Sequence, residues 1–538
     1  MLATMALVIA AVVMLRRIGG PAAGVRDPLA LFPSRCEAVV VVPELGRTGA
    51  RIGALARTRL ADLAASLAGF QSTEQLLAEL GRQAGFDFRS PESMRAAGLD
   101  PAGPLAVYLP LEGAPVAALP PGDRSRLEAL VARLAADRSG ATHRGQAAGG
   151  AQPIVTFSAE GSPEPALAYV IAQGFLLVSA GPRCVAALEA VLALKPEGSL
   201  AREPRVAAAR GELERGEAYA FLCPGSARSQ RLELAYGLGA GLSLAADEVR
   251  LSSDIPLSDD QAKALASFAE PAGADLVSKL EPGAFFVARL GGDPRILQPF
   301  AAFLVPPAFQ AAMRRADLDV SGEILGNLKP GVAASLSLSP SASLEASPEL
   351  DPRLTNPFQL VHLTALGRSV DEGRARATLE KIAAVAPRFG AQMESRELQG
   401  TRVLASRYHL GEGASLALRD GLVLVTGGPG QMDALLQRLS GEGGLVLANP
   451  GATRALARDG FALFLDIGRL VASLRALPDS AYGVGGFAIK AAASRYLDAV
   501  GELAGLRLSG RVERGRLHAE LALSLNPAPA QKKEPQAP

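Results

Sequence analysis

The sequence contains no tryptophan, and only 5% of its 538 residues are aromatic. Proteins that stack sugars or nucleic-acid bases need aromatic platforms, so this scarcity argues against both classes. Neither sign of charge is in excess, because the sequence has 55 Lys and Arg residues and 54 Asp and Glu residues. The formal net charge of +1 gives no electrostatic reason for a polyanionic partner, and we expect no nucleic acid among the partners.

Cysteine is scarce too, with Cys36, Cys184 and Cys223 as the whole complement. An odd and low number predicts no disulfide framework. Cys184 follows a Gly-Pro-Arg tripeptide at an expected helix start, where the helix dipole would lower the pKa of a thiol. No histidine lies near it in sequence, so we interpret Cys184 as a buried thiol without a reactive role. In an oxidising compartment Cys184 could pair with Cys223, an alternative that the sequence leaves open.

Motifs of catalysis and metal binding are missing as well. None of the histidines has a second His or a Cys at metal-ligand spacing. Neither a G-x-S-x-G elbow nor an H-E-x-x-H motif is present. We therefore predict no catalytic residue, no metal site and no cofactor, and a protein that is not an enzyme. The four scattered histidines are His143, His362, His409 and His518.

Glycine-rich stretches provide the most tempting functional signal. "TGGPGQMDALL" at 426–436 joins an expected strand to an expected helix, and the N–H groups of such a turn can bind phosphate. The Walker A motif needs Gly-Lys-Ser/Thr at the helix start, whereas the residues here are Gly430-Gln431-Met432. We interpret this turn as structural, the glycines at 237–242 as sites of close packing and 482–487 as a loop.

The first 15 residues, "MLATMALVIAAVVML", form an uncharged apolar run that Arg16-Arg17 closes. The run is shorter than the roughly 18 to 20 residues that span a bilayer, and no basic segment precedes it. It is apolar all round and a Gly/Pro-rich hinge follows, which favours a membrane anchor over the alternative of a buried core helix. The arginines after the run favour a cytoplasmic location for the rest of the chain, which conflicts with an extracytoplasmic body. A basic segment upstream of the run would remove this conflict.

The body of the chain repeats itself. An offset of 247 positions places Gly174 on Gly421 and Gly181-Pro182 on Gly428-Pro429. Each copy there predicts a hairpin, a β-rich strand and a Gly-Pro break that opens a helix. Three further segments, starting at Ala38, Pro101 and Glu217, match segments that start at Ala284, Lys329 and Gly460.

The expected elements do not follow the regular βαβ alternation of a doubly wound fold. Closing segments from Leu242 and Leu506 alternate in polarity around a polar turn, as half-exposed antiparallel hairpins do. We therefore predict an α+β fold with two tandem copies of a mainly antiparallel sheet, helices packed on it and a membrane helix before it. The expected division is an anchor at 1–17, a linker at 18–36, copy 1 at 37–257, a helical connector at 258–282, copy 2 at 283–526 and a disordered tail at 527–538.

This arrangement resembles the bacterial envelope proteins grouped as domain-of-unknown-function family 3352. The resemblance rests on the apolar N-terminal segment, the strand and helix at 421–439, the strand "GFALFLDIGRL" and the closing hairpin "LRLSGRVERGRLHAELAL". It implies a location in the envelope and an architecture of long α+β copies. The family has no established activity, so the resemblance implies no catalytic residue.

These observations leave three functions open. The first is a non-catalytic, membrane-tethered envelope protein, periplasmic or otherwise extracytoplasmic, with a structural or interaction role and a protein partner. The second is a carrier or sensor of an apolar ligand bound within or between the copies, which a continuous apolar cavity would favour. The third is an unusual hydrolase without a recognisable motif, which a cleft of convergent polar groups would favour.

Overall fold

The computed structural model describes residues 27–58, 61–62, 65–66, 69–147, 152–214, 216–223, 237–245, 247–297, 318–339, 361–389, 392–408, 411–441, 443–479 and 486–526. The predicted anchor at 1–17, the predicted tail and His409 lie outside these residues. The chain folds into two compact units. Unit 1 ends at Ser258 and also includes Arg516–His518, and unit 2 contains the other described residues after Ser258. Among the described residues, no helix is both long and apolar enough to cross a membrane.

Unit 1 contains an antiparallel sheet. Its strands are β1 (Ala38–Val42), β2 (Leu105–Leu109), β3 (Val116–Leu119), β4 (Ala141–Ala147), β5 (Ile154–Ala159), β6 (Leu167–Ala172), β7 (Phe175–Ala180), β8 (Ala218–Leu222), β9 (Leu238–Leu244) and β10 (Glu248–Pro256). They pair in the order β10-β9-β8-β1-β2-β3-β7-β6-β5-β4.

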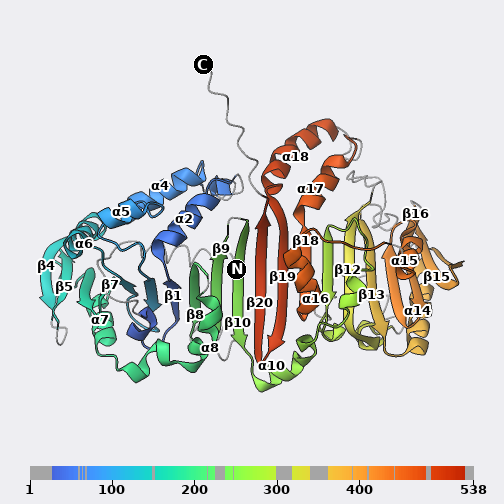
Figure 1. The fold of residues 1–538 in the computed structure, drawn as a ribbon, viewed down its shortest axis with the longest axis horizontal. Coiled ribbons are helices and arrows are strands. Elements are labelled where there is room, and N and C mark those ends of the chain that lie inside the picture. The colour runs from blue at the N-terminus through green and yellow to red at the C-terminus, as the bar shows by residue number, and fades with distance from the viewer. Residues whose placement is uncertain are drawn as a thin grey trace, which may run out of the picture. The chain divides into compact units, whose positions relative to one another are not determined.

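Helices cover both faces of this sheet (Figure 1). The described helices are α2 (Leu45–Leu55), α4 (Thr73–Ala84), α5 (Pro91–Ala96), α6 (Arg124–Ser139), α7 (Cys184–Leu192) and α8 (Pro204–Leu213). Successive residues of β1 alternate between the faces, so Val40 packs under α6 and Val41 packs with α7 and α8. We call these two sides of unit 1 the α6 face and the α7 face.

Unit 2 contains a second antiparallel sheet. Its strands are β11 (Phe286–Leu290), β12 (Leu328–Leu338), β13 (Val361–Ser369), β14 (Gln392–Leu398), β15 (Thr401–Tyr408), β16 (Gly411–Arg419), β17 (Leu422–Gly427), β18 (Phe461–Asp466), β19 (Leu503–Glu513) and β20 (Arg516–Leu525). They pair in the order β20-β19-β18-β11-β12-β13-β17-β16-β15-β14. Position by position, this order is the order of unit 1.

The helices of unit 2 also lie on two faces. They are α10 (Asp259–Ala264), α11 (Ala274–Val277), α14 (Glu372–Val385), α15 (Gln431–Leu439), α16 (Pro450–Arg458), α17 (Ile467–Ala476) and α18 (Gly486–Val500). Leu379 of α14 packs on one face, the α14 face, while Leu435 of α15 belongs to the core of the other, the α15 face. α17 and α18 form a helical pair (Figure 1), which an ion pair between Arg475 and Asp498 joins at 2.6 Å. Both units confirm the α+β class and the mainly antiparallel sheets.

Side-chain caps fix where the two corresponding helices α6 and α14 begin. The carboxylate of Asp123 accepts hydrogen bonds from the backbone of Ser125 and Arg126, and Asp371 accepts one from Arg374. These bonds satisfy N–H groups that the first helical turn leaves without partners. The caps therefore mark equivalent starting points for α6 and α14.

The segment 258–282, expected as a connector, is packed into unit 2. Leu280 is fully buried in the core of the α15 face. Arg289 of β11, 2% exposed, donates from Nη1 to the carbonyl of Ala272 at 2.8 Å and from Nη2 to the carbonyl of Asp459. Burial lowers the pKa of this guanidinium, and the two carbonyls offset part of the cost of burying it. The segment is thus a structural element of unit 2.

A disulfide joins Cys36 to Cys223 in unit 1, and the described Cys184 is a free, buried thiol. The alternative of a Cys184–Cys223 bridge is therefore wrong. The pairing follows from topology, because β1 and β8 are antiparallel neighbours and the cysteines flank the ends that meet. Their Cα atoms lie 5.6 Å apart, within the usual range for a disulfide.

We expect the disulfide to stabilise unit 1. Reduction, or the substitution Cys223→Ser, should lower the free energy of unfolding by about 2–4 kcal/mol, because the bond closes a long loop in the unfolded chain. Chemical denaturation with and without reductant measures this change. Denatured, unreduced protein should titrate with a single free thiol. Cys184→Ala is the control: it should remove that thiol and leave the effect of reductant intact, and several free thiols in unreduced wild type would contradict the pairing.

Candidate functional site

An apolar cavity of about 130 Å³ lies in unit 2, between α14 and the sheet. Ala375, Leu379 and Ile382 of α14 form its roof, and Val332, Leu416, Val423 and Val425 of the sheet are among its floor residues. One wall is the π-helical turn η6 (Val320–Ile324). We call this space the α14 cavity.

The few polar side chains at the α14 cavity already have partners within the protein. Asn327 exchanges two hydrogen bonds with the backbone of Asp371, at 2.9 and 3.0 Å. Thr378 donates to the carbonyl of Arg374 at 2.9 Å. Glu323 accepts from Lys381 with both carboxylate oxygens, at 2.8 and 3.0 Å. A ligand in the cavity would therefore meet hydrocarbon, and its size rather than its polarity would decide its fit.

Unit 1 fills the corresponding space with larger side chains. Leu127 and Ala375 each lie four residues after their aspartate caps, and Leu127 is fully buried. Seven residues after the caps, unit 1 has the buried Leu130 where unit 2 has Thr378. On the sheet, Leu119 of β3 corresponds to Gly367 of β13 in the pairing register. Val423 likewise corresponds to the larger Leu176, whereas Leu379 corresponds to the smaller Val131.

The α14 cavity costs stability. The cavity is partly open, so about 24 cal/mol per Å³ of enclosed volume sets an upper bound of about 3 kcal/mol for 130 Å³, relative to a filled core. That is a large share of the 5–15 kcal/mol that stabilises a typical domain. Because unit 1 has the same strand order but larger buried side chains at three of these positions, we relate the cavity to side-chain size and not to the topology.

The opposite side of the same strands carries a row of four buried hydroxyl groups. Thr364 of β13 lies directly opposite Ser335 of β12 and Thr426 of β17, and Thr426 lies opposite Ser415 of β16. All four side chains are at most 1% exposed. At the strand positions of Ser335, Thr364, Thr426 and Ser415, unit 1 has Tyr108, Val116, Ser179 and Ala168, in that order.

Beside the hydroxyl row lies a buried polar group that the sequence did not reveal. Ser337 donates to Glu281 at 2.5 Å, and Glu281 lies 3.9 Å from Nδ1 of His362. Gln431 contacts the same His362 nitrogen at 2.9 Å. Burial acts to raise the pKa of Glu281, but the hydrogen bonds with His362 and Ser337 outweigh it, and the pKa is lowered. Together with the hydroxyl row, these residues form what we call the α15 polar cluster.

The α15 polar cluster does not have the geometry of a nucleophilic triad. The hydroxyl of Ser337 is bound by the carboxylate of Glu281, so the imidazole is not placed to take its proton as in a Ser-His triad. Among the described residues, no three His, Cys, Asp or Glu side chains are grouped for a metal ion. His143 and His518 lie elsewhere, on β4 and β20.

The Gly-Pro turn before α15 is already occupied by a carboxylate. Glu412 accepts from the N–H of Gly430 at 3.4 Å and from Ser415 at 3.0 Å, and it forms an ion pair with Arg396. A negative side chain at the helix start repels a phosphate from the same N–H groups. This arrangement supports the structural interpretation of 426–436.

The remaining glycine and cysteine signals have structural positions. A Cβ on Gly239 or Gly241 would lie within 3.0 Å of the side chain of Leu213, so these glycines allow α8 to pack on β9. Burial raises the pKa of the Cys184 thiol, which opposes the lowering expected from its helix start.

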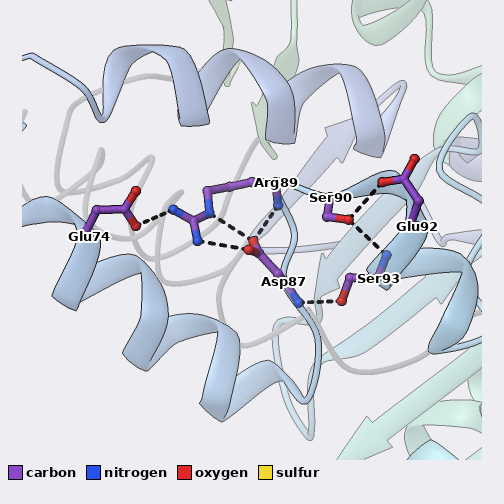
Figure 2. Close-up of polar contacts among 6 residues, drawn as sticks. All are labelled: Glu74, Asp87, Arg89, Ser90, Glu92 and Ser93. Atoms are coloured by element: carbon purple, nitrogen blue, oxygen red, sulfur yellow. Dashed lines mark hydrogen bonds and ion pairs between the residues drawn. The ribbon is translucent and has the colours of Figure 1, made fainter. Parts of the chain in front are cut away.

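A separate polar network fastens the segment between α4 and α5 in unit 1 (Figure 2). Arg89 donates to both carboxylate oxygens of Asp87 at 3.0 and 2.9 Å and to Glu74 at 2.6 Å. Ser93 accepts from the backbone of Asp87, and Ser90 caps α5. Its charged groups are paired with one another, and we assign it a structural role.

No protein-family model matches this sequence, and no curated protein matches it. Among solved structures, crystal forms I and III of TP0453 align with 47% and 45% of this chain and with 79% and 77% of their own chains. The sequences are 12% and 11% identical, and the TM-score is 0.26 in both cases. A likeness at this level carries no argument about function.

We expect Gly428 to be required for the fold of unit 2. Its φ of +109° is strained for other residues, and a Cβ there would lie 2.4 Å from Cδ2 of His362. Gly428→Val should lower the free energy of unfolding by at least about 1–3 kcal/mol in denaturant titrations. Gly430→Asn is the matched control and should cost less, because its Cβ meets nothing within 4 Å and Asn tolerates a positive φ.

The same variants test the anion hypothesis. Isothermal titration of wild type with inorganic phosphate should show no binding at this turn. Phosphate binding that a folded Gln431→Ala variant loses would overturn the structural interpretation.

Proposed function

We propose that this protein is a non-catalytic, extracytoplasmic envelope protein that binds a small apolar group in the α14 cavity. The observation that carries the proposal is the contrast between the two units. Unit 1 closes the space with Leu119, Leu127 and Leu130, whereas unit 2 leaves about 130 Å³. A ligand that fills the cavity would offset its cost, which is at most about 3 kcal/mol.

The volume indicates the kind of ligand. Engineered cavities of about 150 Å³ lined by aliphatic side chains bind benzene and xenon. A cavity of about 130 Å³ suits one aromatic ring or a short branched hydrocarbon, not a complete lipid. The ligand is therefore a small apolar molecule or the apolar end of a larger one.

Two features support the extracytoplasmic location. The Cys36–Cys223 disulfide fits an oxidising compartment, since stable disulfides are rare in the cytoplasm. The apolar run at 1–15 suits a tether to the membrane. The equal strand orders support our further proposal that the two units arose by tandem duplication and then diverged.

A second candidate function is an interaction role, as in a structural envelope protein. On α18 the side chains of Phe487 and Tyr496 are 76% and 66% exposed. Exposed aromatic residues are favoured at protein interfaces, where they become buried against a partner.

Filling the α14 cavity should separate binding from folding. Ala375→Leu introduces the residue that unit 1 has at this position, and it should raise the free energy of unfolding by about 1–3 kcal/mol. Benzene should raise the melting temperature of wild type, because a ligand stabilises the state that binds it, and should have no effect on Ala375→Leu.

The control is Ala377→Leu, two residues along α14 on its exposed side, which should keep the benzene effect. An equal benzene shift in wild type and Ala375→Leu would place the binding elsewhere. No shift in folded wild type would remove the proposal.

The membrane tether is tested by fractionation. The full-length chain should sediment with membranes, and a chain that begins at Gly24 should remain in the soluble fraction, because it lacks the apolar run. Equal solubility of the two chains would end the anchor interpretation.

A further inference from the structure

We propose that the α15 polar cluster is a second binding site, which takes a small hydroxylic ligand: water or a short polyol. The inference is independent of the α14 cavity, because it concerns the other face of the sheet. It starts from buried polar atoms that have no hydrogen-bond partner among the described residues. They are Ser335 Oγ, Thr364 Oγ1, Thr426 Oγ1, Gln431 Oε1 and Arg438 Nη2.

These atoms belong to one continuous group. Thr364 lies between Ser335 and Thr426 in the sheet register. His362, two residues before Thr364 on the same face of β13, contacts Gln431 at 2.9 Å. Glu281 joins His362 to the connector segment, and Arg438 of α15 donates from Nε to the Lys279 carbonyl at 2.9 Å. The residues that carry these atoms thus lie on the α15 face of the sheet or on α15 itself.

Their burial without partners is costly, because each hydroxyl loses its hydrogen bonds to bulk water. Unit 1 avoids the cost at one of the corresponding positions, with Val116 in place of Thr364. Where unit 2 has Ser335, unit 1 has Tyr108, whose hydroxyl donates to the Arg35 carbonyl at 2.8 Å. In this row unit 1 therefore leaves one hydroxyl without a partner, that of Ser179, whereas unit 2 leaves three, those of Ser335, Thr364 and Thr426.

The donor set indicates the class of ligand. Three hydroxyl groups can each donate and accept, the Gln431 amide oxygen accepts, and the Arg438 nitrogen donates. The charges of Glu281 and Arg438 already offset one another, and burial lowers the pKa of Arg438. A neutral molecule that donates and accepts hydrogen bonds fits this set, which is the chemistry of a hydroxyl group.

The substitution Thr364→Val tests the proposal through the sign of its effect. Val has the shape of Thr without the hydroxyl. If a hydroxylic ligand satisfies Thr364, the variant loses a hydrogen bond, and the melting temperature should fall by about 2–4 °C. If Thr364 is simply unpartnered, the melting temperature should stay or rise, which would overturn the proposal. Ser179→Ala in unit 1 is the control. Ser179 also lacks a partner, but it lies between Val116 and Ala168, so no neighbouring hydroxyl helps to hold a ligand there, and its substitution should not lower the melting temperature.

A crystal structure distinguishes a ligand from a bond within the protein. Crystals grown without polyol should show electron density within hydrogen-bond distance of Thr364 Oγ1 and Ser335 Oγ, and Thr364→Val should lose it. A soak in ethylene glycol separates the two sources: replacement of the density by the diol identifies a polyol site, and unchanged density identifies bound water. Wild-type crystals without density there in either condition would contradict the proposal.

Discussion

The pairing register of β13 with β12 and β17 is the constraint on which both sites of unit 2 depend. Thr364 opposite Ser335 and Thr426 places a hydroxyl row on the α15 face. The same register turns Gly367 towards the α14 cavity, because neighbouring residues of a strand point to opposite faces. A slip by one residue would exchange the faces, and hydroxyl groups would line the cavity while aliphatic groups met the polar cluster.

Sequence patterns were sufficient for the elements and their class. The Gly-Pro turns precede α7 and α15 as expected, and Asp123 and Asp371, which are aspartates of the kind that favour a helix start, cap α6 and α14. Such signals are local, since a cap or a turn depends on a few neighbouring residues. Their agreement with the structure follows from that short range.

The candidate sites depend on alignment between strands, which local patterns do not determine. Matching Pro101 with Lys329 sets Tyr108 beside Leu336, whereas the sheet register sets Tyr108 at the position of Ser335. Short apolar strands fit almost equally well after a shift of one residue, yet that shift changes the face of every side chain. The cavity and the hydroxyl row become visible only once the register is known.

The disulfide shows the same limit at longer range. Cys36 and Cys223 are 187 residues apart in sequence, and only the adjacency of β1 and β8 brings them together. No local pattern distinguishes Cys36 from Cys184 as the partner, because the choice depends on the order of strands in the sheet.

The two units show how one topology can carry different side chains on each face of its sheet. Central strands with both faces covered can change one face without changing the other, because alternate residues belong to different cores. In unit 2 the α14 face has smaller residues than unit 1 at Gly367 and Ala375, and the α15 face has a polar residue at Thr364 where unit 1 has Val116. Both changes lie on or against β13, so each must leave its backbone pairing intact. A ligand bound on one face would then affect the packing of the other face through small shifts of β13. Side-chain volume and hydrogen bonding, rather than a change of topology, are therefore the means by which this fold can acquire a binding site.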